Sequence, residues 1–213
     1  MNKKIKVLLV VTLLILMVGC SKKLKWSNPE AQLNETTKIK EIKEIKEFGI
    51  PIENYTYILT DEMKLRNELV QAVIDRIPEL KEAFKRSKNR IDLTKKINVI
   101  PYSNYYNETS QEYTINVLIV NTSNESILSG SFDVHSVLSP NLKVFEGGPT
   151  KFTELVKELH PMEFITASYV FHLSEEDNAL IEGLTAENID LAIENLNINR
   201  KNMDNNELTT YSD

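Results

Sequence analysis

The chain is poor in the residues that build common catalytic and metal sites. It has a single cysteine in 213 residues, so no disulfide can form within it. Its six glycines leave little material for phosphate-cradling loops, and it has no GxSxG, Ser-x-x-Lys or paired Cys/His motif. The three histidines (His135, His160 and His172) lie far apart in sequence without ligand-type spacing. We therefore predict no catalytic residue, no metal site and no cofactor, and expect a protein that is not an enzyme.

Long hydrophobic runs are also missing, apart from a short one near the start. Residues 7–18 are apolar, but at about 1.5 Å per residue they cover only about 18 Å, whereas the hydrocarbon core of a bilayer is about 30 Å thick. Lysines bound the run on both sides, at Lys3, Lys4 and Lys6 before it and at Lys22, Lys23 and Lys25 after it. This pattern predicts a targeting signal and not a membrane-spanning helix.

The only cysteine ends this signal-like segment, in Met17-Val18-Gly19-Cys20. The segment resembles the lipobox of bacterial lipoproteins, in which the cysteine sulfur is diacylated and the peptide is cut just before it. The resemblance implies a signal peptide over 1–19, lipid attachment at Cys20 and a location on the extracytoplasmic face of the cell membrane. Two acyl chains would anchor the protein stably, since each buried methylene contributes about 0.8 kcal/mol. An ordinary secretory signal is the alternative, because it shares the same basic and apolar regions.

Charge bears on the class of partner. The chain has 31 acidic and 25 basic residues, a formal net charge of −6, and removal of 1–19 would take away three of the lysines. An acidic surface argues against nucleic acid, which selects basic patches. We therefore expect contact with the membrane through the lipid anchor and with a protein or cell-wall partner.

After the polar residues 20–37, two segments of the chain are predicted to be helical. Residues 20–37 show no apolar period and are expected to form a flexible, lipidated tether. In residues 39–48 an isoleucine or phenylalanine recurs every three positions, so on a helix the apolar stripe drifts by about 60° per repeat. We expect a short helix or helical stalk that ends at Gly49. It would act as a spacer or, alternatively, as a docking element.

The clearest helical signal covers residues 60–89. Thr60 is a suitable N-cap, and apolar residues follow at three- and four-residue steps, which gives one apolar face. Pro78 is expected to kink or divide this helix, because it removes a backbone hydrogen bond. The face would pack on its own domain or on a partner. The predicted helical region is 38–90.

After Arg90 the apolar period changes from 3.6 to 2, which predicts strands. In Tyr113–Val120 the odd positions face one side, and Leu118 and Val120 bury the second half of the strand on both faces. Thr114 and Asn116 are expected to face out. Further strands are predicted over 127–137, 142–145, 164–173 and 189–198, the last with a bulge. We expect Gly147-Gly148-Pro149 to break the strand over 142–145, and residues 199–213 to be a disordered tail.

Strands separated by turn clusters predict an antiparallel sandwich over 91–198. Two motifs, Val117–Asn124 and Leu159-His160-Pro161-Met162-Glu163 leading into Val170-Phe171, resemble those of immunoglobulin-like accessory domains of bacterial lipoproteins. That family usually has glycine where this chain has Met162. The resemblance implies an α+β protein with an N-terminal helical arm followed by an antiparallel immunoglobulin-like β-sandwich. Such domains share no catalytic residues.

These features predict a membrane-anchored, extracytoplasmic binding or interaction module. An envelope hydrolase is one alternative, because pairs of catalytic carboxylates have no sequence signature. A structural spacer is another. Tyrosines beside the predicted first strand are interpreted either as a contact surface for protein or glycan or as packing at the domain edge; they are Tyr102, Tyr105, Tyr106 and Tyr113.

Overall fold

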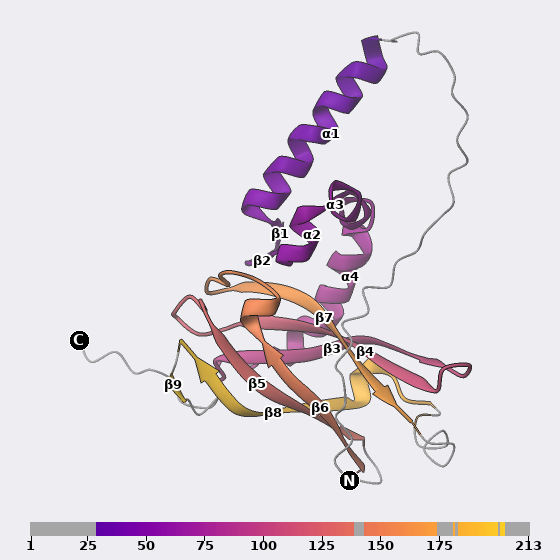
Figure 1. Ribbon diagram of the computed structural model, residues 1–213, viewed down its shortest axis with the longest axis vertical. Coiled ribbons are helices and arrows are strands. Elements are labelled where there is room, and N and C mark those ends of the chain that lie inside the picture. The colour runs from indigo at the N-terminus through magenta and orange to yellow at the C-terminus, as the bar shows by residue number, and fades with distance from the viewer. Residues whose placement is uncertain (1–28, 139–142, 174–180, 182, 200, 203–213) are drawn as a thin grey trace, which may run out of the picture.

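The computed structural model describes residues 29–138, 143–173, 181, 183–199 and 201–202. It has the α+β architecture expected from the sequence, in three layers. Helices lie on one face of a five-stranded sheet, and a four-stranded sheet packs on the other face (Figure 1).

The chain forms helices and two short strands first and the longer strands afterwards. The helical elements are α1 (Pro29–Phe48), α2 (Asp61–Leu65), α3 (Asn67–Ile74), α4 (Ile77–Ser87), η1 (Lys88–Arg90), η2 (Phe152–Glu154) and η4 (Ala186–Asn188). The strands are β1 (Ile50–Ile52), β2 (Tyr55–Tyr57), β3 (Ile97–Asn107), β4 (Glu112–Asn121), β5 (Gly130–Leu138), β6 (Lys143–Lys151), β7 (Glu163–His172), β8 (Ile189–Ile198) and β9 (Lys201–Asn202). Across the described residues, no helix combines the length and the apolar character needed to span a bilayer.

The two sheets bring distant segments side by side. The larger sheet has the order β1-β2-β7-β4-β3, and the smaller sheet has the order β6-β5-β8-β9. Among the described strands, neighbours pair antiparallel except β2 and β7, which are parallel at Thr56–Glu163 and Tyr57–Phe164. Within the predicted sandwich region 91–198, every pair of described strands is antiparallel as expected; the parallel pair arises because β2, from the region predicted to be helical, adds to this sheet. Parallel neighbours need a long connection, and here it contains α2, α3, α4 and strands β3 to β6.

Proline explains two errors of the sequence prediction. β3 was not predicted, because Pro101 interrupts its alternation. β6 continues through Gly147-Gly148-Pro149, where we expected the strand to break. Both are edge strands, where a residue without an N–H is tolerated. Their registers also shift nearby, between Pro101 and Ser103 on β3 and between Asp133 and His135 opposite β6.

Strand β8 has the predicted bounds and the predicted bulge. Its register with β5 shifts between Ser131 and Asp133, and Asn195 in the same stretch has a φ of 52°. Strand β7 begins and ends one residue before the predicted bounds. The predicted tail contains β9, and residues 203–213 of that tail lie outside the described part of the chain.

The period-2 pattern of β4 separates two apolar cores. Ile115, Val117 and Ile119 point into the core between the two sheets, whereas Leu118 and Val120 belong to a second core under the helices. The predicted burial of this strand on both faces is therefore confirmed. Thr114, which we expected to face solvent, is instead buried.

Aromatic rings join the helical layer to the larger sheet. The ring centroid of Phe84 in α4 lies 4.8 Å from that of Phe164 in β7 and 5.1 Å from that of Tyr55 in β2. The ring centroid of Tyr57 in β2 lies 5.4 Å from that of Phe164. The apolar helical face thus packs on its own domain, and the predicted helical region 38–90 also supplies β1 and β2 to the sheet.

The helix predicted over 60–89 is divided into three. Thr60 caps α2 as predicted, and its Oγ1 accepts a hydrogen bond from the Met63 N–H at 3.4 Å. The backbone leaves the helical conformation at Arg66 (φ −124°, ψ 114°) and again at Arg76 (φ −114°, ψ 16°). Pro78 lies in the first turn of α4, where it loses no helical hydrogen bond. The division therefore comes before the proline and not at it.

Helix α1 ends as predicted, at Phe48. Gly49 has a left-handed φ of 73°, and its N–H donates to the Ile45 carbonyl at 2.9 Å. A Cβ at this position would also clash with the Tyr57 carbonyl oxygen, so the turn needs glycine. The helix begins at Pro29 and so includes the second half of the segment 20–37 that we expected to be flexible.

Arg90 connects the two sheets. Its guanidinium donates to the Pro101 carbonyl of β3 at 3.2 Å, and to the Ala186 carbonyl of η4 and the Ile189 carbonyl at the start of β8, both at 2.7 Å. These bonds close one side of the core between the sheets.

Candidate functional site

Cys20, the predicted lipid-attachment residue, lies outside the described residues, as does the signal segment 1–19. Lipid attachment therefore stays a prediction.

The histidines lie in separate places. Each one is next to a different carboxylate, at 3.3 to 3.8 Å: the pairs are His135 with Glu194, His160 with Glu158, and His172 with Glu112. Within the described ranges, no three His, Cys, Asp or Glu side chains are grouped so that they could hold a metal ion.

The predicted tyrosine cluster is divided between the two faces of the larger sheet. Tyr113 is buried between the sheets, and its hydroxyl accepts a hydrogen bond from Asn104 Nδ2 at 3.0 Å. Tyr106 packs against the same core, and Tyr102 packs under the helices. Only Tyr105 among these four is exposed, at 47%. Packing therefore accounts for most of the cluster.

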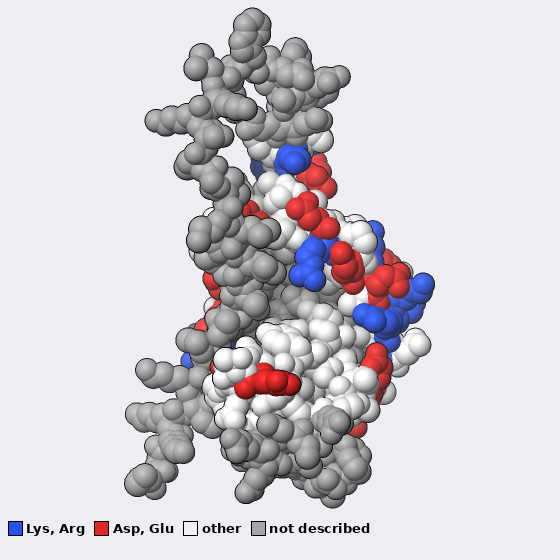
Figure 2. Space-filling view, turned by 90° about the vertical axis from the view of Figure 1, so that its right-hand side faces the viewer, with Lys and Arg blue, Asp and Glu red and all other residues white. Residues whose placement is uncertain are grey.

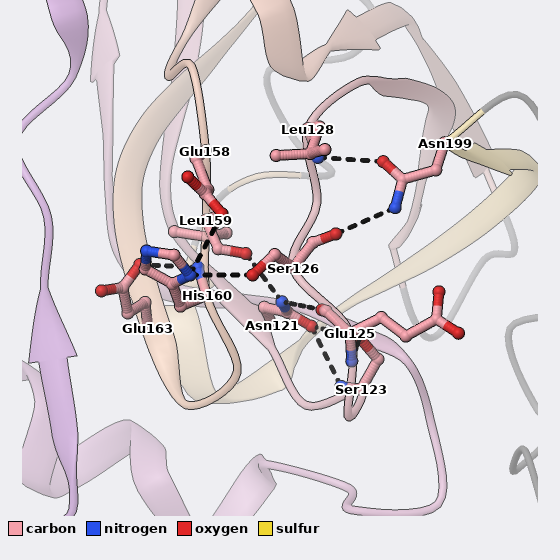
Figure 3. Close-up of polar contacts among 10 residues, drawn as sticks. All are labelled: Asn121, Ser123, Glu125, Ser126, Leu128, Glu158, Leu159, His160, Glu163 and Asn199. Atoms are coloured by element: carbon pink, nitrogen blue, oxygen red, sulfur yellow. Dashed lines mark hydrogen bonds and ion pairs between the residues drawn. The ribbon is translucent and has the colours of Figure 1, made fainter.

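The turn after β4 and the turn before β7, which belong to the two motifs noted in the sequence, meet in one hydrogen-bonded cluster (Figure 3). Asn121 is fully buried, and its Nδ2 donates to the Glu125 and Leu159 carbonyls, both at 2.9 Å. Its Oδ1 accepts from the N–H and the hydroxyl of Ser123, at 3.0 and 2.7 Å. The Met162 N–H donates to the Asn121 carbonyl at 2.8 Å. One asparagine thus connects the turn after β4 to the turn before β7.

The same cluster is fixed from two further directions. Met162 has a left-handed φ of 63°, and its carbonyl accepts from the Thr56 N–H of β2 at 3.1 Å. Asn199 follows β8, and its side chain accepts from the Leu128 N–H and donates to the Ser126 carbonyl, both at 2.9 Å (Figure 3). The cluster therefore joins both sheets at this end of the molecule.

A serine, a histidine and a glutamate also come together here, but they do not form a proton relay. Ser126 Oγ lies 2.8 Å and Glu158 Oε1 lies 3.3 Å from the same atom, Nδ1 of His160 (Figure 3). A hydrolytic triad needs the nucleophile on one ring nitrogen and the acid on the other. The backbone N–H of His160 also donates to Glu163 Oε2 at 2.6 Å, and this bond stabilises the turn. These contacts stabilise the two loops.

A cavity of about 300 Å³ lies between the helices and the larger sheet. Its floor carries the side chains of Tyr57, Tyr102 and Thr166, from three different strands. Apolar residues of α2, α3 and α4 form its walls, and Arg76 and Glu79 lie at its rim. Burial raises the pKa of Tyr57 to about 12, while its hydrogen bond to Thr166 acts in the opposite direction. Such a concave, mostly apolar site with a few polar groups is typical of ligand binding.

A second hollow, of about 500 Å³, lies where α1 meets β1. Ile45, Ile50 and Ile77 line it together with Phe48, which is 67% exposed. Glu41 adds a carboxylate. An exposed phenylalanine next to a hollow is a candidate protein contact.

On one face of the molecule, charged side chains gather at the level of the helices (Figure 2). Figure 2 shows lysine, arginine, aspartate and glutamate side chains crowded at the level of the helices, whereas the described surface below them on this face carries few charges. Both candidate surfaces therefore lie in the charged, helical part of the molecule.

Comparison of the chain with protein-family models, curated proteins and solved structures gave no match.

The sequence prediction missed the residues around the cavity. Tyr57 was placed in a helical region, and Arg76, Glu79 and Thr166 were not singled out. The alternation in Ile50–Ile52 and Tyr55–Tyr57 was a usable strand signal. No local pattern indicates that these strands would pair with β7 beneath the helices.

Proposed function

We propose that the chain is a membrane-anchored, extracytoplasmic lipoprotein that binds a protein or cell-wall partner. The anchor rests on the lipobox-like segment that ends at Cys20. The observation that carries the binding role is the exposed Phe48 beside the hollow at the base of α1. Full burial of a phenylalanine contributes about 1.5–3 kcal/mol, and aromatic side chains are enriched at the centres of interfaces. Glu41, which also lines the hollow, favours a partner that presents apolar and basic groups.

We also propose that the two packed sheets are an immunoglobulin-like sandwich, to which β1, β2 and the helices are additions. Three observations support this assignment: the shared core between the sheets, the bonds that Asn121 makes between the two motifs, and the left-handed φ of Met162. Glycine is the usual residue at that position in the resembling family, and a left-handed conformation is what glycine favours.

Labelling tests the anchor. Cells expressing the wild type or Cys20→Ala would be grown with a palmitate analogue, and the purified protein examined for incorporation. We expect label in the wild type and none in Cys20→Ala. Equal labelling of the two proteins would contradict the lipid attachment.

Matched substitutions test the partner surface. Phe48 and Leu93 are similarly exposed, at 67% and 62%, and only Phe48 lines the hollow. Lipidated protein carrying Phe48→Ala or Leu93→Ala would be used to capture partners from its own envelope. We expect Phe48→Ala to lose a partner that Leu93→Ala retains. Identical capture by both variants would contradict this surface as the binding site.

The spacer alternative has one observation in its favour. Helix α1 has 20 residues, which at about 1.5 Å each span about 30 Å, and it projects away from the sheets (Figure 1). A spacer would tolerate Phe48→Ala and lose function when α1 is shortened by two turns. A binding module would show the reverse sensitivity.

The hydrolase alternative has less support. Glu41 and Glu44 lie one turn apart on the same helix face, and Glu79 is the carboxylate at the other cavity. Acid and base catalysis needs carboxylates that converge on a substrate from different directions.

A further inference from the structure

Strands of the larger sheet present hydroxyl groups to the cavity under the helices. Tyr57 Oη lies 3.2 Å from Thr166 Oγ1 and 3.8 Å from Met63 Sδ, so this hydroxyl is already engaged. Tyr102 differs. Burial raises the pKa of Tyr102, and the nearby Arg76 guanidinium acts in the opposite direction. Within the described part of the chain, no hydrogen bond of the Tyr102 hydroxyl is formed, so it is available to a ligand.

The rim of the cavity carries one charge of each sign. Arg76 lies just before α4 and Glu79 lies in its first turn, and both side chains are exposed. Of the ion pairs formed among the described residues, none includes either of them. Guanidinium groups bind carboxylates in a bidentate manner, and a carboxylate accepts from an ammonium group. The rim is therefore complementary to a molecule that carries both charges close together.

The cavity walls limit the size and polarity of the uncharged part of such a ligand. Val73 and Leu80, from two successive helices, are partly buried there, and Ala83 is buried. About 300 Å³ is at the lower end of the range for small-molecule sites, about 300–1,000 Å³. The occupant is thus small and has an apolar body.

We infer that this cavity binds a free α-amino acid with an apolar side chain, in its zwitterionic form. Its carboxylate lies against Arg76, its ammonium group against Glu79, and its side chain between the helices and the sheet. A purely anionic ligand would be repelled by the Glu79 carboxylate and by the formal net charge of −6 on the chain. A zwitterion has no net charge and avoids the second of these repulsions. The cavity lining does not include Phe48, so this inference is independent of the partner proposed above.

Calorimetric titration of the purified protein tests the ligand class. The probes are L-leucine, L-methionine and L-phenylalanine, each compared with its N-acetyl derivative, which lacks the ammonium group, and its amide, which lacks the carboxylate. We expect saturable one-to-one binding of at least one amino acid. Since hydrogen bonds to charged groups are the stronger ones, each blocked form should bind at least about tenfold more weakly.

Matched variants test the site. Arg76→Gln and Glu79→Gln should each weaken binding at least about tenfold. Arg86 and Glu82 lie on α4, as Glu79 does, and do not line the cavity, so Arg86→Gln and Glu82→Gln should leave the dissociation constant within about twofold. Ala72→Trp would fill the cavity without removing a charge, and it should abolish binding while the circular dichroism spectrum stays that of the wild type.

Three results would overturn the inference. The first is no saturable binding of any of the three amino acids at millimolar concentration. The second is equal or tighter binding of a blocked form, which would indicate an amphipathic anion or a peptide in place of a zwitterion. The third is equal loss of affinity in the rim variants and in their helix-matched controls. Because capture through Phe48 is assayed separately, none of these results bears on the proposed partner surface.

Discussion

The bonds of Asn121 make a sharp prediction about stability. Asn121 is fully buried and forms hydrogen bonds with Ser123, Glu125 and Leu159 (Figure 3). At about 0.5–1.5 kcal/mol net for each bond, and with water able to replace those at the exposed turn, Asn121→Ala should cost about 2–3 kcal/mol. The cost arises because one residue connects two loops that are far apart in sequence.

Asn121→Asp is the more informative change, because it keeps the shape of the side chain. The two bonds accepted from Ser123 are preserved, but the donating amide is replaced by an oxygen that faces the Glu125 and Leu159 carbonyls at 2.9 Å. At neutral pH this places a buried negative charge against two acceptors. We therefore expect a loss of about 3–4 kcal/mol, which is larger than that of the alanine variant.

The direction of the pH dependence follows from the same geometry. A protonated carboxyl can donate to one of the carbonyls, so its pKa in the folded protein should be raised above the ordinary value of about 3.9. A group whose pKa is raised on folding contributes stability that is present at low pH and lost as the pH rises. The stability deficit of Asn121→Asp should therefore shrink as the pH falls from about 7 to about 4.

Urea unfolding followed by circular dichroism, at neutral pH and in mild acid, measures this effect. Asn107→Asp is the matched control, since Asn107 is exposed and its Oδ1 accepts from the Thr109 and Ser110 N–H groups, as a carboxylate also can. The control should stay within about 0.5 kcal/mol of the wild type. If Asn121→Asp were as stable as the wild type, or if its deficit did not change with pH, the reasoning would be wrong.

Three further predictions test the helical layer and the buried tyrosines. Phe84→Ala should lower the free energy of unfolding by about 3–5 kcal/mol in one cooperative transition, whereas Leu65→Ala, at a residue 83% exposed, should change it by at most about 0.5 kcal/mol. Separate unfolding of helices and sheets in the first variant would contradict the shared core. Gly49→Ala should cost about 1–3 kcal/mol by the same assay, because of its φ of 73° and the clash with the Tyr57 carbonyl; an unchanged midpoint would contradict this. Burial raises the pKa of Tyr57 and of Tyr113 from 10 to about 12, so the folded state holds these protons more tightly and stability should fall as the pH rises from 10 to 12. Ultraviolet titration checks this, and ionisation of all tyrosines near pH 10 in the folded protein would refute it.

Much of the local structure was predictable, because it depends on residues close together in the chain. The Thr60 cap, the end of α1 at Gly49 and the bulged strand Ile189–Ile198 need only a capping hydroxyl, a left-handed turn and a period of 2. The division of 60–89 into three helices was not predictable in the same way. Its breaks are at Arg66 and Arg76, which have no marked breaking tendency, and not at Pro78.

The candidate site was much less predictable than the strands. Tyr57, Tyr102 and Thr166 come from three strands and Arg76 from the link between α3 and α4, and nothing in the sequence around any one of them refers to the others. The same holds for Asn121 and Leu159, which were recognised as parts of two motifs but not as bonded partners.

The sequence by itself determined the α+β fold class, the face of β4 that packs between the two sheets, and the places where α1 and β8 end. Those features follow from steric preferences and apolar periods that act within one element. Only the tertiary structure decided that β2 lies parallel to β7, that helices cover the larger sheet, and that a cavity remains between them. Apolar periodicity specifies that a face is buried without specifying against what, and that choice is made by the packing of the whole chain.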